Sequence, residues 1–351
     1  MQPATPRTAS APLRRVLALC AAGLLAVTLA PGTGAWAEGP VAAPAATAVA
    51  LDEALGDLDK LEEAMKSKKS INDEIIQYLD LVGTHFRAIQ GPEAPAADAG
   101  DEARKAYEDA LARHEKDVAD YRKKAEKLIF KALGLTRLKR STNERDEVNL
   151  KAAQVLGGLA AAYPGTVAET HSEDEAVAKR AKHNLGERED LAKKLRKEIE
   201  GLHKIKYDLN TDVLQAAFAA LGDLDTVDSI EWMIENYSHA KNNEVEWLVA
   251  AHKSLIKFTY APGRVRYDLV EQFVRTYAGV ESAANTSSTD AKDLAKKRFW
   301  DDIRTFTVQV VQFYAGNPVD AESNEALSTM AQFDDWFRDH KNVRKAPWVD
   351  D

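Results

Sequence analysis

From Leu51 to the end of the chain, apolar residues recur every three or four positions, with polar or charged residues between them. This spacing places the apolar side chains on one face of an α-helix, because an α-helix has about 3.6 residues per turn. We find no convincing run in which apolar and polar residues alternate strictly between turn residues, as they would in a half-buried strand. The pattern therefore predicts an all-α fold.

The N-terminal part of this pattern predicts a helical hairpin. Apolar stripes within 51–65 and 71–89 are followed by a loop rich in Gly and Pro from Gly91 to Gly100. After the loop, positions at alternating spacings of four and three form the seam of a heptad repeat. The seam residues are Tyr107, Leu111, His114, Val118, Tyr121, Ala125, Leu128 and Ala132. A short loop makes neighbouring helices fold back on one another, so we expect an antiparallel, coiled-coil-like hairpin over residues 51–140.

Residues 141–351 carry a series of shorter helical stripes. Breaker residues separate several of them, as at Pro164-Gly165, Pro262-Gly263 and Gly316-Asn317-Pro318. Residues 173–206 are highly charged and predict a long, mostly solvated helix. Its thin apolar stripe consists of Leu191, Leu195, Ile199 and Leu202. This region is predicted to be a second helical domain.

One segment of this region resembles a known type of helical repeat. The run Ala216-Ala217-Phe218-Ala219-Ala220-Leu221-Gly222 is similar to the end of the second helix in a HEAT-like repeat, where small residues face the neighbouring helix. Ala250, Ala251 and Leu255 repeat part of its spacing 34 residues later. The resemblance covers roughly residues 145–340 and implies an irregular α-solenoid of stacked helix pairs. An ordinary multi-helix bundle is the alternative.

The first 37 residues are interpreted as a targeting signal and not as part of the fold. They contain three arginines, no acidic residue, an apolar run from Val16 to Ala30 and the sequence Ala35-Trp36-Ala37. The apolar run is about 15 residues long, shorter than the roughly 20 residues of a membrane-spanning helix. We predict a Sec-type signal peptide cleaved after Ala37, and hence a periplasmic or extracellular protein. Residues 38–50, rich in Ala and Pro, are expected to form a flexible linker.

Composition and charge exclude several classes of function. The net charge of −9 disfavours nucleic acid as a partner, because phosphate neutralisation needs a basic face. The only cysteine lies within the expected signal peptide, so a disulfide framework is excluded. The sequence lacks HExxH, GxSxG, GxGxxG and P-loop motifs. We therefore expect no cofactor, no metal site and no enzymatic activity.

A basic amphipathic stretch over residues 122–140 is the first candidate interaction site. Its basic residues are Arg122, Lys123, Lys124, Lys127, Lys131, Arg137, Lys139 and Arg140, opposed only by Glu126. Such a stretch can contact an anionic lipid surface or an acidic partner. The competing interpretation, which we prefer for an acidic chain, is a solvated helix face balanced by nearby acidic helices.

Tryptophans in the C-terminal half are the second candidate. Trp232, Trp247 and Trp348 are singled out because Trp is enriched at interface hot spots. Packing in the helical core is the commoner role of such residues. Trp348, in the tail after the last stripe, could instead anchor the end of the chain.

These observations favour an exported, non-enzymatic helical scaffold that binds another envelope protein or associates with itself through the hairpin. One alternative is a peripheral membrane protein that uses residues 122–140 for weak contact with anionic lipid. The other is an enzyme whose site is assembled from distant helices, which leaves no local motif.

Overall fold

A computed structural model describes residues 50–67, 72–89, 91–92, 100–134, 146–205, 210–238, 245–285 and 287–349. The chain divides into two units, 1–45 and 46–351, and everything below concerns the second. The predicted signal peptide and nearly all of the predicted linker lie outside the described residues.

The described residues confirm the all-α prediction. Their α-helices are α1 (Leu51–Lys66), α2 (Asn72–Ala88), α3 (Asp101–Leu133), α4 (Asp146–Gly158), α5 (Glu175–Ile205), α6 (Thr211–Leu224), α7 (Val227–Tyr237), α8 (Val245–Leu255), α9 (Gly263–Ala284), α10 (Ala291–Tyr314) and α11 (Met330–Asp339). Two short 3-10 helices, η3 (Leu159–Ala162) and η4 (Ala168–His171), lie between α4 and α5. An isolated β-bridge joins Val319 and Ala326.

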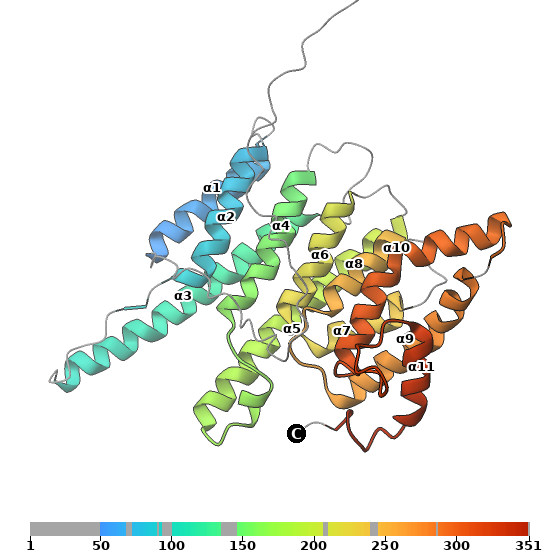
Figure 1. Ribbon diagram of the computed structural model, residues 1–351. Coiled ribbons are helices and arrows are strands. Elements are labelled where there is room, and N and C mark those ends of the chain that lie inside the picture. Colours follow the sequence, from blue (N-terminus) through green and yellow to red (C-terminus); the bar gives the residue numbers. More distant parts are fainter. Residues whose placement is uncertain are drawn as a thin grey trace, which may run out of the picture. The chain divides into compact units, whose positions relative to one another are not determined.

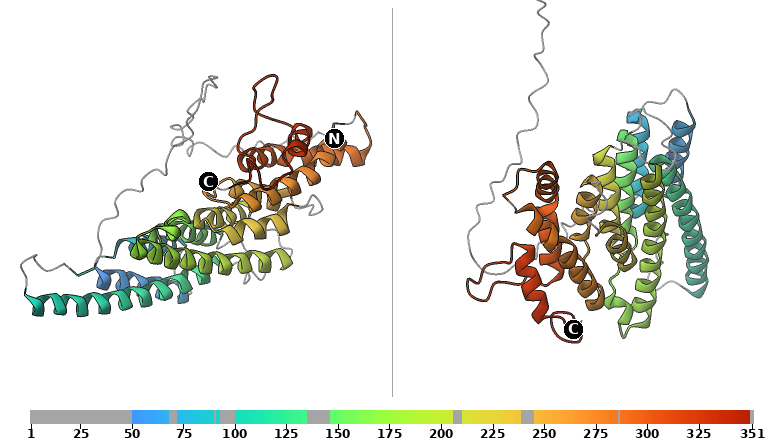
Figure 2. Two further views of the ribbon diagram at one scale, coloured as in Figure 1. Left: turned by 90° about the horizontal axis from the view of Figure 1, so that it is seen from below. Right: turned by 90° about the vertical axis from the view of Figure 1, so that its right-hand side faces the viewer.

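The even-numbered helices form a continuous row. Helix α2 packs against α4, α4 against α6, α6 against α8, and α8 against α10. Figure 1 shows this row running across the molecule, with α1 beside α2 at one end. Helices α5, α7, α9 and α11 contact one another in turn and are joined to the row through α6, α8 and α10. The result is a stack of successive helix pairs, as Figure 2 also shows from two other sides.

A glycine lies at each of three successive contacts of the even row, where it leaves no room for a side chain. A Cβ atom on Gly83 of α2 would come within 2.8 Å of Val155 Cγ1 on α4. A Cβ on Gly157 of α4 would lie 3.2 Å from Ala220 Cα on α6. A Cβ on Gly222 of α6 would lie 3.0 Å from the carbonyl oxygen of Ser254 on α8. A larger side chain at these positions would push the helices apart.

The region predicted to be a hairpin joins the row through α4. The part of the predicted hairpin before the Gly- and Pro-rich loop contains two helices, α1 and α2, which pack against each other. Both α2 and α3 pack on α4. The buried apolar side chains of α1–α3 belong to the same cluster as those of α4–α11. The predicted seam of α3 divides at its middle, because Tyr121, Ala125, Leu128 and Ala132 are buried whereas the four seam positions before them are half-buried. The domain boundary near residue 140 stays a prediction.

The 34-residue spacing found in the sequence corresponds to neighbouring helices. Asp223 at the end of α6 pairs with Lys257 just beyond α8, with 2.8 Å between Oδ1 and Nζ. The Asp225 carboxylate accepts a hydrogen bond from the Thr259 backbone N–H at 2.8 Å. Both pairs are 34 residues apart, so the repeated Ala-Ala motif marks two consecutive members of the row. Membership of the HEAT-like class stays a prediction.

His252 is a buried member of this core. Its side chain on α8 is fully buried, packs on the rings of Phe273 and Tyr277, and places Nδ1 3.2 Å from Thr307 Oγ1 of α10. Burial lowers the pKa of His252 to about 3, against a smaller opposing effect of the Tyr237 backbone. The imidazole is therefore neutral in the folded protein at ordinary pH.

We predict that Gly222→Ala lowers the free energy of unfolding by about 1–3 kcal/mol, because its Cβ meets the carbonyl oxygen of Ser254 on α8 and Cβ of Lys257 and forces a shift. Gly186→Ala is the matched control, since a Cβ at this exposed position in α5 meets nothing within 4 Å. Helix propensity alone should make this control more stable by about 0.5–1 kcal/mol. Urea unfolding of the two variants should give shifts of opposite sign. Shifts of the same sign would contradict the close-packing interpretation.

A second prediction concerns the pH dependence of stability. Unfolded His252 binds a proton around pH 6.5, whereas folded His252 does so only near pH 3, so its contribution to stability is lost as the pH falls below 6.5. Between about pH 7 and about pH 5 the wild type should lose about 2 kcal/mol of unfolding free energy through this residue. His252→Gln cannot titrate, so its loss over the same interval should be smaller by that amount. Equal losses in urea titrations of the two proteins would rule out this assignment.

Candidate functional site

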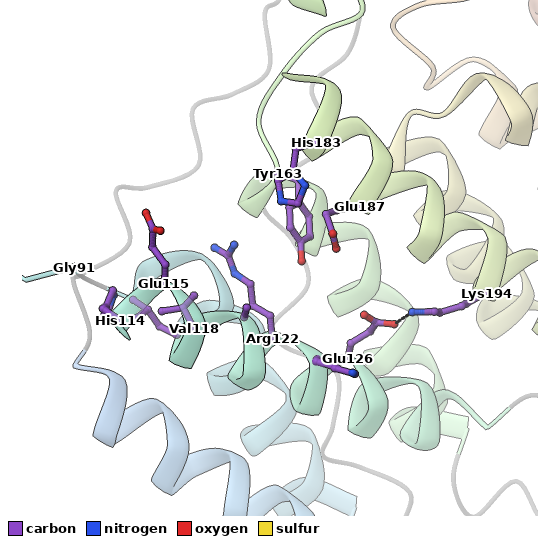
Figure 3. A pocket seen from close by; sticks show the side chains of 13 residues that line it. Gly91, His114, Glu115, Val118, Arg122, Glu126, Tyr163, His183, Glu187 and Lys194 are labelled. Atoms are coloured by element: carbon purple, nitrogen blue, oxygen red, sulfur yellow. Dashed lines mark hydrogen bonds and ion pairs between the residues drawn. The ribbon is translucent and has the colours of Figure 1, made fainter. Parts of the chain in front are cut away.

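Helices α3 and α5 face each other across a groove. Helix α3 packs on α4 and α5 packs on α6, but α3 and α5 are not closely packed together. The groove has two adjoining hollows that share Lys123, Glu126 and Lys194 in their walls. We call the first, with a volume of about 740 Å³, the Arg122 hollow, and the second, of about 540 Å³, the lysine hollow. The Arg122 hollow is drawn in Figure 3.

The lysine hollow gathers cations from both helices. Its charged residues are Lys123, Glu126, Lys127 and Lys131 from α3 with Lys194, Lys197 and Glu198 from α5. Five lysines against two glutamates leave an excess of three positive charges. The three lysines of α3 are spaced four residues apart, so they line one face of the helix over about 12 Å. Phe130 adds a half-buried aromatic side chain to the same wall.

Several of these cations lack an acidic partner within the described part of the chain. Lys123, Lys127, Lys131 and Lys197 are exposed and form no ion pair there. Lys194 is different, because its ammonium pairs with the carboxylate of Glu126 across the groove. This pair lies where the two hollows meet and is marked by a dashed line in Figure 3.

Arg122 is held against two aromatic rings. Its guanidinium carbon Cζ lies 5.4 Å from the ring centroid of Phe86 and 5.3 Å from that of Tyr163, within the range of cation–π attraction. Its Nη2 donates a hydrogen bond to the Phe86 carbonyl oxygen at 3.4 Å. Its buried Nε–H has no acceptor among the described residues. Figure 3 shows Arg122 projecting from α3 toward Tyr163, with Glu115 and Glu187 to either side.

The turn that carries Tyr163 is fixed by two side chains of α5. Arg188 Nε donates to the Tyr163 carbonyl oxygen at 3.0 Å, and its Nη2 donates to that of Gly165. Asn184 Nδ2 donates to the Pro164 carbonyl oxygen at 2.6 Å. The two side chains lie four residues apart and so share one face of the helix. They hold the turn, and with it the Tyr163 ring, against Arg122.

The charges of the Arg122 hollow are balanced. Arg122, Lys123 and Lys194 stand against Glu115, Glu126 and Glu187, and His114 and His183 complete the polar lining. Burial raises the pKa of the Tyr163 phenol to about 12, with Arg122 opposing and the nearby glutamates reinforcing the shift. The phenol is therefore neutral at ordinary pH and presents a hydroxyl to the hollow.

The remaining basic residues of the predicted stretch lie elsewhere. Lys124 points to α1, where its Nζ lies 2.6 Å from Asp59 Oδ1 and 3.4 Å from Glu62 Oε2. Its charge is balanced by an acidic helix, as the competing interpretation of the sequence expects. Arg137, Lys139 and Arg140 lie outside the described residues.

The tryptophans do not join this groove. Trp232 and Trp247 are half-buried in an aromatic cluster with Phe218 and Tyr237, and Trp232 Nε1 donates to Glu200 Oε1 at 2.7 Å. Trp348 is only 2% exposed, and its Nε1 donates to the His340 carbonyl oxygen at 2.6 Å. Its ring packs among those of Tyr267, Trp336 and Phe337. Trp348 therefore anchors the chain end in the fold and presents no free surface to a partner.

Sequence reasoning missed the contribution of α5 to the groove. The apolar stripe of α5 is buried as expected, and this burial directs Lys194 and Lys197 toward α3. The partners of Arg122 were missed too, because Phe86 and Tyr163 lie 36 and 41 positions away in the sequence. A search for cations beside the apolar stripe of α5 could have found Lys194 and Lys197. No local sequence pattern indicates that Arg122 contacts two aromatic rings.

Among the described residues we find neither a group of side chains suited to a metal ion nor a helix suited to span a membrane. Residues 50–349, apart from the segments left undescribed, contain no group of three or more His, Cys, Asp or Glu side chains placed to hold a metal ion. None of the helices in the described ranges is both long and apolar enough to cross a bilayer. Comparisons with protein families, with curated proteins and with solved structures found no match to this chain.

We predict that Arg188→Met lowers the free energy of unfolding by about 2 kcal/mol, because it strips hydrogen bonds from two carbonyl groups of the 163–165 turn. Arg180→Met is the matched control, since Arg180 is exposed on the same helix. The control should change stability by less than about 0.5 kcal/mol. Urea unfolding measures both effects, and indistinguishable midpoints would show that Arg188 does not hold the turn.

Proposed function

We propose that this protein is an exported, non-enzymatic helical scaffold that docks an acidic segment of another envelope protein in the α3–α5 groove. The observation that carries the proposal is the set of exposed lysines in the lysine hollow that lack an acidic partner within the described ranges. A chain with a net charge of −9 has many carboxylates with which these lysines could pair. Their isolation beside a half-buried Phe130 favours a site that is complementary to something outside the chain.

The physical form of the groove suits an extended peptide. Lys123, Lys127 and Lys131 follow α3 over about 12 Å, which is roughly the length of four extended residues. Lys197 faces them from α5, so an acidic segment would meet cations on both sides. Electrostatic complementarity of this kind increases the association rate and selects the partner.

The membrane alternative has less support. The predicted amphipathic stretch takes its apolar face from Leu128, Ile129, Leu133 and Leu135. The first three are buried in the core, and Leu135 lies outside the described residues. A peripheral helix binds a bilayer by burying its apolar face among the lipids. With this face occupied, only the charge remains to attract a membrane.

The enzymatic alternative depends on the Arg122 hollow. Histidines and carboxylates do meet there, but among the described residues His114, His183, Glu115 and Glu187 form no hydrogen bonds with one another. General acid–base catalysis uses groups held within hydrogen-bond reach of the proton that they transfer. The arrangement favours binding over catalysis.

Self-association through the predicted hairpin could use fewer seam residues of α3 than the sequence implied. The C-terminal half of the α3 seam is buried within the protein, which leaves the half-buried positions from Tyr107 to Val118 for a second copy. This remaining segment is about 16 Å long, fewer than two complete heptads.

We predict that the protein binds a fluorescein-labelled hexaglutamate peptide and not a hexalysine peptide. Charge reversal at Lys123, Lys127 and Lys131 to Glu should weaken hexaglutamate binding at least about ten-fold, because it replaces attraction along one wall with repulsion. Fluorescence anisotropy measures the affinity. Raising the ionic strength from about 0.02 M to about 0.5 M should weaken binding to the wild type.

The control for this experiment reverses Lys292, Lys297 and Lys341, which are exposed and lie outside the groove. It changes the net charge by the same amount as the groove variant. Equal weakening in both triple variants would show that net charge and not the groove attracts the peptide. Absence of binding to the wild type at low ionic strength would refute the proposal.

A further inference from the structure

The Arg122 hollow differs from the lysine hollow in the number of anions that it can accept. Its three cations are matched by three carboxylates, so an acidic run placed there would meet repulsion from Glu115 and Glu187. One cation of the Arg122 hollow nevertheless has no anionic partner among the described residues and is held in a fixed position. Arg122 lies within cation–π range of two rings, is bound to one backbone carbonyl, and forms no ion pair within the described part of the chain.

Pre-organisation makes Arg122 a suitable receptor for a planar anion. Guanidinium binds a carboxylate through two parallel hydrogen bonds, and this fork geometry gives strength as well as directional specificity. The rings of Phe86 and Tyr163 hold the guanidinium in place, so less side-chain entropy is lost when a ligand binds. Nη1 is not among the buried atoms and has no acceptor among the described residues, so Nη1 and the second N–H of Nη2 are the donors that a ligand can reach.

The two hollows are close enough for one peptide to reach both. Arg122 and Lys131 are nine positions apart on α3, a rise of about 14 Å, which an extended chain of about four residues spans. The hollows also share Lys123, Glu126 and Lys194 in their walls. A peptide whose acidic residues lie along the lysine hollow can therefore end in the Arg122 hollow.

We propose that Arg122 recognises the free C-terminal carboxylate of the docked segment. The inference rests on the proposed function and adds a requirement to it: the partner presents an acidic stretch at its own C-terminus. A terminal carboxylate fits the balanced hollow better than an acidic run, because it brings one negative charge with it. The carboxylates of Glu115 and Glu187 remain available as acceptors for backbone N–H groups of the same terminal residues.

The first test changes only the ligand. A peptide of six glutamates followed by Gly-Gly, with fluorescein at its N-terminus, is titrated as the free acid and as the C-terminal amide, and fluorescence anisotropy gives both affinities. We expect the amide to bind the wild type about ten-fold more weakly, in keeping with the loss of one charge-assisted bidentate contact. Equal affinities of acid and amide would overturn the inference while leaving the proposed function intact.

The second test identifies the residue. In Arg122→Gln the difference between acid and amide should disappear, while affinity for the amide stays close to that of the wild type. Arg122→Lys keeps the charge but lacks the planar fork, so it should keep only part of the difference. Arg113→Gln, an exposed arginine on the same helix outside both hollows, should keep all of it. A difference that persists in Arg122→Gln would place the carboxylate elsewhere and overturn the inference.

The third test examines recognition of a terminal carboxylate by Arg122 with a ligand that has no acidic side chains. N-acetyl-triglycine, which has one carboxylate and no acidic side chain, is added to the ¹⁵N-labelled protein, and the arginine Nε–H signals are followed by NMR. We expect the Arg122 signal, assigned by its loss in Arg122→Gln, to shift with the acid and not with its amide. This result would stand even if hexaglutamate failed to bind and the proposed function were wrong. A signal that stays unmoved, or that inorganic phosphate shifts at lower concentration than the acid, would overturn the assignment.

Discussion

The tight packing of helices at glycines along the even row is the constraint on which the rest of the structure depends. At the α2–α4, α4–α6 and α6–α8 contacts a glycine lies where a Cβ atom would meet the neighbouring helix. Close packing of this kind maximises dispersion contacts and leaves no room for a larger side chain. It fixes the positions of α4 and α6, and these two helices support α3 and α5. The α3–α5 groove is thus a consequence of how tightly the row beneath it is packed.

The groove exists because α3 and α5 rest on different members of the row. Each helix buries its own apolar stripe, and their charged flanks are left to face each other. Lys194 pairs with a carboxylate of α3, whereas the other lysines of the groove have no acidic partner among the described residues. Clustered cations without partners repel one another and destabilise the folded state. Local features that oppose stability without an internal compensation are expected mainly at functional sites, and this is why the groove carries the proposed function.

The sequence predicts the helices well because their signal is local. The stripe of α5 from Leu191 to Leu202 and the heptad spacing of α3 both correspond to helices with a buried face, and the repeated Ala-Ala motif marks two neighbours of the even row. Long-range relations carry no comparable signal. Three features depend on tertiary packing between distant residues: the approach of α5 to α3, the contacts of Arg122 with the rings of Phe86 and Tyr163, and the burial of Trp348. The sequence could therefore indicate the basic residues of α3, which form one wall of the candidate site. It could not indicate that lysines of α5 form the other wall.

The pair between Glu126 and Lys194 determines how selective such a groove can be. Because the pair bridges the two hollows, an incoming carboxylate near Lys194 must compete with a partner that is already in place. The competitor belongs to the same chain and is always present at high effective concentration. A single acidic side chain gains little in that exchange. A segment with several carboxylates could engage Lys123, Lys127, Lys131 and Lys197 as well, and these lysines have no partner among the described residues that would have to be displaced. If the groove docks an acidic segment as proposed, we expect it to discriminate by the number and spacing of negative charges, and we expect dispersed acidic residues on a folded surface to be poor competitors for it.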